Sequence, residues 1–225
     1  MFQTSKRAIL IGGGPISNIP DYLEDLPVVA VDGGLDACIQ HSIKPDYFVG
    51  DMDSASKSAR EYALSNQIPT KPIFEQETND FEKALMHVDA LGYICFGFLD
   101  GRIDHTLATL HVVQKLLHKR PVLLYGCEDV MITASSTIAL RIPVGERLSV
   151  WPLGVVHFES SNGLRYPLEG IKMAAGCQIG TSNSVYKEDV RVTVSEQNIG
   201  TYLIILSNRY FKELFMLTDF YSVPK

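Results

Sequence analysis

The segment PDYFVGDMDS, residues 45–54, joins a short apolar run to an acidic turn. The apolar part is only a few residues long and is closed by Gly and Asp, which is typical of a buried β-strand. The pattern recurs in AILIG (8–12), PVVAVD (27–32), YICFGF (93–98) and PVLLYG (121–126). Helical spacing of apolar residues is found instead in residues 35–41, 55–66, 80–91 and 105–118. This alternation of strands and helices predicts an α/β N-terminal domain with a mainly parallel, three-layer sheet.

The second half of the chain shows a different pattern, in which turns separate short β-rich runs. These runs are TIALRI (137–142), RLSVWPL (147–153), VVHFES (155–160), QIGTS (178–182), VRVTVS (190–195) and TYLIIL (201–206). They predict a smaller C-terminal all-β domain, a sandwich or barrel-like sheet. We therefore expect two domains, residues 1–134 and 135–225. The aromatic-rich segment 210–221 could pack on the sandwich or on a second subunit.

Composition excludes several classes of protein. The 225 residues carry a net charge of −6, so no overall attraction to nucleic acid or to an anionic membrane is built in. The longest apolar runs fall well short of the ~18 residues that a membrane span needs, and residues 8–11 are too few for the apolar region of a signal peptide. Four scattered cysteines have neither zinc nor redox spacing. We expect a cytoplasmic protein with reduced cysteines.

Acidic residues follow the predicted strands and begin the predicted helices. They are Asp32, Asp51, Asp53, Asp80 and Asp104. Ligands of open α/β sheets bind beyond the carboxyl ends of the strands, so these side chains should converge on one sheet edge. Carboxylate oxygens suit Mg²⁺, and a cation would relieve their mutual repulsion. Any single Asp-x-Asp, such as residues 51–53, is more often an ordinary turn or helix cap.

Arg102 beside Asp104 offers a cation that can hold phosphate oxygens. The alternative for Arg102 is an internal ion pair with a neighbouring Asp. Gly101 would let the backbone approach a ligand closely, or would simply serve a turn. Residues 12–15, GGGP, follow a strand but fit neither common phosphate-loop motif, which argues against a Walker-type NTPase. Among the histidines, His105 alone lies in an acidic motif.

Four blocks occur in the order seen in the thiamine pyrophosphokinase family, which this sequence resembles. They are DGG (32–34), PDYFVGDMDS (45–54), QETNDFEKAL (76–85) and GRIDHTLATL (101–110). GLRY (163–166) and GTSN (180–183) resemble the family's thiamine-side segments. The sequence departs from the family pattern at Asp100, which is an addition within GFLDGR, at Asn79, where Thr is common, and at Glu77, where Asp is frequent.

The resemblance implies that the hydroxyl of thiamine attacks the β-phosphorus of ATP and releases AMP, in a homodimer with thiamine near the subunit interface. It implies Mg²⁺ on Asp51, Asp53 and Asp80, with Asp32 and Asp104 as further ligands or acceptors and Arg102 on phosphate oxygens. Asp53 or Asp80 would accept the hydroxyl proton, or the proton would be transferred late, since metal-bound carboxylates are weak bases. Nucleotide, phosphate or thiamine contacts are expected from Asp32, Gly33, Gln76, Asn79, Gly101, Arg102, His105, Thr181, Ser182 and Asn183, the last three on the thiamine pyrimidine.

Two other functions fit the same blocks. The acidic and glycine-rich blocks concern ATP and metal, so another acceptor such as a hydroxymethylpterin is an alternative. The other is a non-catalytic nucleotide- or thiamine-binding regulator, against which the complete set of Asp residues argues.

Overall fold

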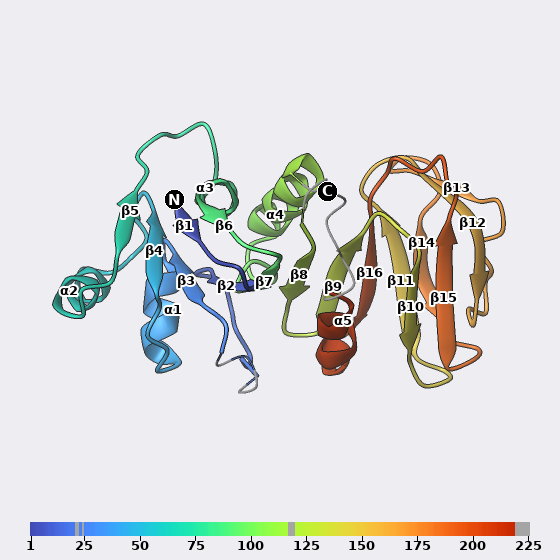
Figure 1. Ribbon diagram of the computed structural model, residues 1–225, viewed down its shortest axis with the longest axis horizontal. Helices are drawn as coiled ribbons and strands as arrows, with labels where there is room; N and C mark the ends of the chain where they lie inside the picture. The colour runs from blue at the N-terminus through green and yellow to red at the C-terminus, as the bar shows by residue number, and fades with distance from the viewer. Residues whose placement is uncertain (21–22, 24, 117–119, 219–225) are drawn as a thin grey trace. The chain divides into compact units, whose positions relative to one another are not determined.

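The computed structural model describes residues 1–20, 23, 25–116 and 120–218 (Figure 1). The chain divides into two compact units. The first unit contains residues 1–113 and 124–127, and the second contains residues 114–123 and 128–225. The strand β8 (Val122–Tyr125) lies where the two units divide.

A parallel sheet forms the centre of the first unit, in the order β7-β2-β3-β4-β5. Its strands are β2 (Ala8–Ile11), β3 (Val28–Val31), β4 (Tyr47–Gly50), β5 (Thr70–Pro72) and β7 (Tyr93–Phe96). Every residue of β2, β4 and β7 is buried. Burial on both faces explains why these strands are continuous apolar runs in the sequence and not alternating ones.

Helices connect these strands. They are α1 (Gly34–Gln40), α2 (Lys57–Ser65), α3 (Asp80–His87) and α4 (Ile103–Leu116). The chain moves from β3 through β4 to β5 by way of α1 and α2, and returns to β7 by way of α3. Because such crossovers are right-handed, α1 and α2 lie on one face of the sheet and α3 on the other (Figure 1). The predicted three-layer α/β arrangement is confirmed.

The end of α3 differs from the prediction. The spacing of apolar residues continues to Leu91, but the helix ends at His87, and Val88–Asp89 form the strand β6. This strand pairs in parallel with β1 (Phe2–Gln3), and the ring of Phe2 lies 5.3 Å from that of Tyr47 in β4. Pairing with a distant segment therefore overrides the local helical pattern.

The sheet order creates a switch point between β2 and β7, because the chain leaves β2 toward β3 and later returns to the other side of β2. Glycine permits close approach of the loops there. A Cβ on Gly34 would collide with the carbonyl oxygen of Ile11, and one on Gly97, whose φ is +75°, would lie 2.5 Å from the oxygen of Gly12. The loops after β2, β3 and β7 consequently pack backbone against backbone.

The second unit contains two antiparallel sheets, as predicted for an all-β domain. One has the order β14-β11-β16-β9, with β14 at Gly180–Ser184, β11 at Arg147–Pro152, β16 at Tyr202–Ser207 and β9 at Asp129–Ala134. The other has the order β10-β15-β12-β13, with β10 at Ile138–Arg141, β15 at Asp189–Val194, β12 at Val156–Asn162 and β13 at Lys172–Met173. Buried rings of Phe158 and Tyr202 meet edge-on, 5.3 Å apart, between the sheets.

A short helix completes the second unit. After a 3-10 turn, η2 (Asn208–Tyr210), the helix α5 (Phe211–Leu217) contacts β9 and β10 and buries Phe211, Leu214 and Leu217. The expected packing of this aromatic segment on the sandwich is thus observed for α5, while residues 219–221 lie outside the described residues. Within the described residues, no helix is both long and apolar enough to cross a membrane.

Candidate active site

A cavity of about 860 Å³ opens at the carboxyl edge of the parallel sheet, at the switch point. Its wall combines the loops after β2 and β7 with the start of helices α3 and α4. Residues that line it include Gly12–Gly14, Asp32, Gly33, Asn79–Phe81, Gly97, Phe98 and Asp100–Arg102, together with Asp104 and His105. Most of the residues that the sequence assigned to the nucleotide therefore border one space.

Three carboxylates converge at this edge. Ligand oxygens of Asp32, Asp51 and Asp80 all lie within 4.8 Å of one another. They come from three elements, since Asp32 follows β3, Asp51 follows β4 and Asp80 is the first residue of α3. The set matches the hard oxygen donors that Mg²⁺ prefers.

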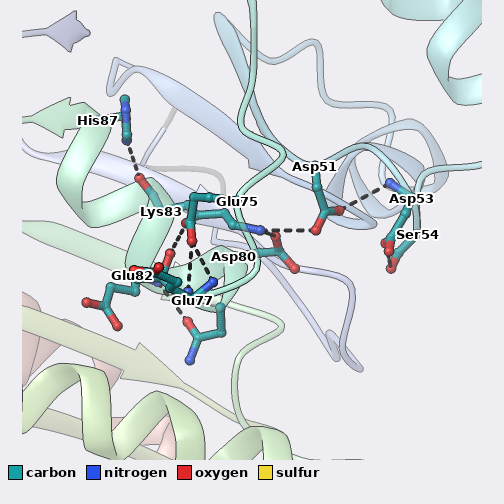
Figure 2. A network of polar contacts seen from close by, with 11 residues as sticks. Asp51, Asp53, Ser54, Glu75, Glu77, Asp80, Glu82, Lys83 and His87 are labelled. Carbon is teal, nitrogen blue, oxygen red and sulfur yellow. Dashed lines mark hydrogen bonds and ion pairs between the residues drawn. The ribbon is translucent and has the colours of Figure 1, made fainter.

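A buried lysine, which the sequence analysis missed, lies among these carboxylates. The Lys83 ammonium is 3.0 Å from Oδ2 of Asp51 and 3.4 Å from Oδ1 of Asp80, and only 2% of its side chain is exposed (Figure 2). Lys83 stands three residues after Asp80 on α3, so the two side chains share a helix face. That spacing in the block QETNDFEKAL is the signal that could have revealed it.

The surroundings shift the pKa of each carboxyl group. Burial raises the pKa of Asp32, and burial together with the charges of Asp32 and Asp51 raises that of Asp80. Burial is the largest single influence on Asp51 and acts to raise its pKa, but the hydrogen bond and charge of Lys83 together with hydrogen bonds from Asp53 outweigh it and leave that pKa below its ordinary value. Oδ1 of Asp32 is buried and has no hydrogen-bond partner among the described residues, a costly state that a bound cation would relieve.

Asp53 does not belong to the converging group. It is exposed, its Oδ1 accepts a 2.9 Å hydrogen bond from Oγ of Ser54, and its backbone N–H donates to Oδ1 of Asp51 over 3.3 Å (Figure 2). Met52, between the two acids, has a φ of +72°. The turn thus directs Asp51 toward the cluster and leaves Asp53 at its margin.

Arg102 and Asp104 form a two-point ion pair at the start of α4. Nε and one terminal nitrogen of Arg102 donate to the two carboxylate oxygens of Asp104, over 3.1 and 2.6 Å. The hydrogen bond from Arg102 lowers the pKa of Asp104. The backbone N–H of His105 also donates to Asp104, over 3.1 Å. The internal ion pair, one of the two possibilities for Arg102, is what the structure contains, and both side chains remain exposed beside the cavity.

Two further predicted residues lie on or near the segment before α3. Asn79 lines the cavity, but its side-chain oxygen accepts from the N–H of Glu82 over 2.8 Å and so caps α3. Gln76 is exposed in the preceding loop and is not among the residues lining the cavity.

Asp100, for which no role was predicted, holds the loop after β7 in place. Its Oδ2 accepts a 2.6 Å hydrogen bond from the backbone N–H of Cys127, and its φ is +66°. The next residue, Gly101, has a φ of +70° and lines the cavity. Asp100 therefore helps to define the wall from which Arg102 projects.

The residues proposed for thiamine lie on β14 in the second unit, and none of them lines the cavity of the first unit. Thr181 and Ser182 are exposed. Asn183 is buried, and its amide holds the backbone of Tyr166 from both sides: Oδ1 accepts from the N–H over 3.0 Å, and Nδ2 donates to the carbonyl over 2.6 Å. The structure joins GLRY to GTSN through this residue.

Two family models match the chain. One is described as the catalytic domain of thiamin pyrophosphokinase and matches residues 23–124; the other is described as its vitamin B1 binding domain and matches residues 136–199. The chain belongs to the thiamine pyrophosphokinase family.

Curated relatives of this family member include thiamine pyrophosphokinase 1 of Oryza sativa subsp. japonica, which is 29% identical over 174 residues. Thiamine pyrophosphokinase 1 of Arabidopsis thaliana is 28% identical over 173 residues. The alignments cover 70% and 68% of this chain, and 66% and 63% of the two relatives. The matched region is therefore somewhat less than two thirds of either plant protein.

Solved structures of the family share the fold. The crystal structure of thiamin pyrophosphokinase from Geobacillus thermodenitrificans superposes with a TM-score of 0.72 at 23% identity, and covers 89% of this chain and 96% of that one. The structure of thiamine pyrophosphokinase from Bacillus subtilis gives a TM-score of 0.73 at 20% identity, with 90% and 99% covered.

Proposed function

We propose that the protein is a thiamine pyrophosphokinase, which transfers a pyrophosphoryl group from ATP to the hydroxyl of thiamine and forms thiamine diphosphate and AMP. The observation that carries the proposal is the meeting of Asp32, Asp51 and Asp80 beside a cavity at the switch point of the sheet. Pyrophosphoryl transfer depends chiefly on positioning and on neutralising charge, and this edge offers both.

Asp51, Asp80 and Asp32 would hold Mg²⁺, and Oδ1 of Asp32, which has no hydrogen-bond partner in the described part of the chain, fits that role. A bound Mg²⁺ would neutralise charge on the phosphate oxygens and orient them. Asp53, at the margin of the cluster, would act through water or accept the proton of the thiamine hydroxyl. The role proposed for Asp53 thus differs from the direct metal binding proposed for the three converging acids.

The cavity gives the nucleotide a place to bind. The loops of Gly12–Gly14 and Gly97–Gly101 border it, and the packing of bare backbone there suits close approach by phosphate groups. Arg102 can exchange the carboxylate of Asp104 for phosphate oxygens, because the ion pair is exposed and therefore weakly held. Asp104 would hold Arg102 beside the cavity until the nucleotide binds, and would leave metal binding to the other acids.

The thiamine ring is assigned to the second unit, through the GLRY and GTSN segments. Support comes from the vitamin B1 binding model over residues 136–199 and from the exposed Thr181 and Ser182. Asn183 would act there by holding Tyr166, because its own amide is already engaged. The assignment of nucleotide binding and catalysis to residues 1–134 and of thiamine binding to residues 135–225 remains a prediction. So do the homodimer and the cytoplasmic location.

The deciding experiment measures AMP release from ATP and Mg²⁺ with and without thiamine, and detects thiamine diphosphate by mass spectrometry. Thiamine-dependent AMP together with the diphosphate product is the expected result. AMP that appears only with a hydroxymethylpterin would instead establish the alternative acceptor. Tight ATP binding with no AMP for any acceptor would indicate a regulator that binds without turnover.

A further inference from the structure

Among the described residues, the carboxylate cluster contains more negative charge than the buried cation Lys83 balances. Asp32, Asp51 and Asp80 contribute three carboxylates, and Lys83 contributes one ammonium. Lys83 is held on α3, which packs against β3 and β4, the strands that lead to Asp32 and Asp51. With every group ionised, the four side chains have a net charge of −2, which equals the charge of one divalent cation in magnitude.

The position of Lys83 is costly unless it serves a partner. A buried ammonium needs ion pairs, and breaking such a pair strongly destabilises a protein. An ammonium has only donors and cannot itself bind a metal, so Lys83 is not a ligand. Its two contacts are with two of the three acids that would bind the metal, Asp51 and Asp80. The third acid, Asp32, keeps a buried oxygen without a described partner.

We propose that Lys83 is a positioning residue, which holds Asp51 and Asp80 toward each other before a cation arrives and sets the cluster to accept a single divalent cation. The proposal rests on the metal role given to these acids under the proposed function. Before metal binds, the ammonium limits repulsion between Asp51 and Asp80. When a metal ion binds, the positive charge of Lys83 repels it and so lowers the affinity of the cluster for the metal.

This role makes opposite predictions for folding and for metal binding. Replacing Lys83 by Met keeps most of the length of the side chain but removes the charge, so that the cluster reaches −3. The metal-free variant should be less stable than the wild type, whereas a divalent cation should bind it more tightly. A lysine whose charge did not act on the metal position would lower stability when replaced without raising metal affinity.

The test uses the full-length protein at pH 8 without ATP or thiamine. Thermal unfolding is followed in EDTA and in a series of Mn²⁺ concentrations, and Mn²⁺ affinity is measured by electron paramagnetic resonance. For Lys83→Met we expect a lower Tm in EDTA, a larger rise in Tm with Mn²⁺ than the wild type shows, and an affinity about 10-fold tighter, since a positive charge that contacts two of the carboxylates is removed. Lys57→Met removes an exposed lysine whose partner is Glu61 and should change none of these.

Lys83→Arg covers the case in which Lys83→Met fails to fold. It keeps the charge, so its Mn²⁺ affinity should stay within about 3-fold of the wild type. Unchanged or weaker Mn²⁺ binding by folded Lys83→Met would overturn the proposal, as would a 10-fold gain in Lys83→Arg or a wild type that binds no Mn²⁺. Because no substrate is present, a wild type that binds Mn²⁺ in this way but makes no thiamine diphosphate would refute the proposed function alone.

Discussion

The ammonium of Lys83 lies 3.0 Å from Oδ2 of Asp51, although the two residues are thirty-two positions apart in the sequence. The contact ties the first helical turns of α3 to the loop after β4, the two places from which Asp80 and Asp51 reach the cavity edge. Each acid of the cluster is thus held by the fold from a different side, and each can be tested separately.

Asp51→Asn should abolish thiamine-dependent AMP release, with a loss on the order of 10³-fold. The amide keeps the shape of the side chain but cannot supply a metal-binding carboxylate, and it also leaves Lys83 short of a charged partner. We therefore expect a lower free energy of unfolding as well, by about 1–3 kcal/mol. Steady-state kinetics and urea titration measure the two effects, with exposed Glu61→Gln as the control. Near-normal turnover would refute the metal role of Asp51.

Asp32→Asn should stabilise the metal-free protein while it destroys activity. The pKa of Asp32 is raised by burial, so the folded state binds its proton more tightly than the unfolded state does. Stability is therefore lost as pH rises from the unfolded pKa through the folded one, because the folded state must then hold the buried carboxylate in its charged form. Removing the charge should recover about 1 kcal/mol. Thermal unfolding in EDTA at pH 8 checks this; a decrease in Tm would contradict it.

Asp53→Asn tests whether Asp53, at the margin of the cluster, differs from the converging acids in its effect on metal binding. Asp53 is exposed and lies outside the converging group, so the Mn²⁺ affinity of Asp53→Asn should stay within a few-fold of the wild-type value. The Mn²⁺ affinity of Asp32→Asn should be at least 10-fold weaker. Turnover by Asp53→Asn should still fall, owing to its proposed part in proton transfer or in holding water. Loss of Mn²⁺ binding in Asp53→Asn would restore it as a direct ligand.

Arg102→Ala should raise the KM for ATP by about 10- to 100-fold and leave the Tm unchanged. The unchanged Tm follows from the exposure of both Arg102 and Asp104, since such ion pairs contribute little to stability. Arg102→Lys should restore little of the affinity, because an ammonium cannot bind phosphate oxygens in the two-point way of a guanidinium. Full recovery with lysine would mean that only a charge is needed there.

Asn183→Ala should raise the KM for thiamine and lower the free energy of unfolding by about 1–3 kcal/mol, because both backbone groups of Tyr166 lose a partner. Ser182→Ala, on the same strand but exposed, should leave stability within about 0.5 kcal/mol. Both variants should keep the wild-type KM for ATP. A change in the ATP value alone would argue against the thiamine role of β14.

The sequence predicted the parts of the fold whose signal is local. Compact apolar runs closed by Gly or Asp identified β2, β3, β4, β7 and β8, since burial on both faces makes such strands almost entirely apolar. The strand β9 was missed, because DVMITA begins with an acid and has no Gly or Pro to close it. The extent of α3 was overestimated, because its end depends on pairing with β1.

The sequence predicted which residues form the candidate site, but not how their side chains are arranged. The position of Asp32, Asp51 and Asp80 after strands or at a helix start was enough to place them at one edge. The outward turn of Asp53 depends on the positive φ of Met52, and the pairing of Arg102 with Asp104 depends on rotamers that no spacing reveals. Lys83 was overlooked because a lysine within a helix is usually exposed.

The short ladder between Phe2–Gln3 and Val88–Asp89 joins the start of the described chain to the strand that directly follows α3. The ring of Phe2 also contacts that of Tyr47 in β4. Residues Phe2–Gln3 therefore contact both the segment that follows α3, the helix of Lys83, and the strand that leads to Asp51. Fusions, proteolytic trimming or labels near Phe2 would disturb the helix and the strand that carry Lys83 and Asp51 to the candidate site. Recombinant forms that differ only in those residues should be compared for turnover before their kinetics are pooled.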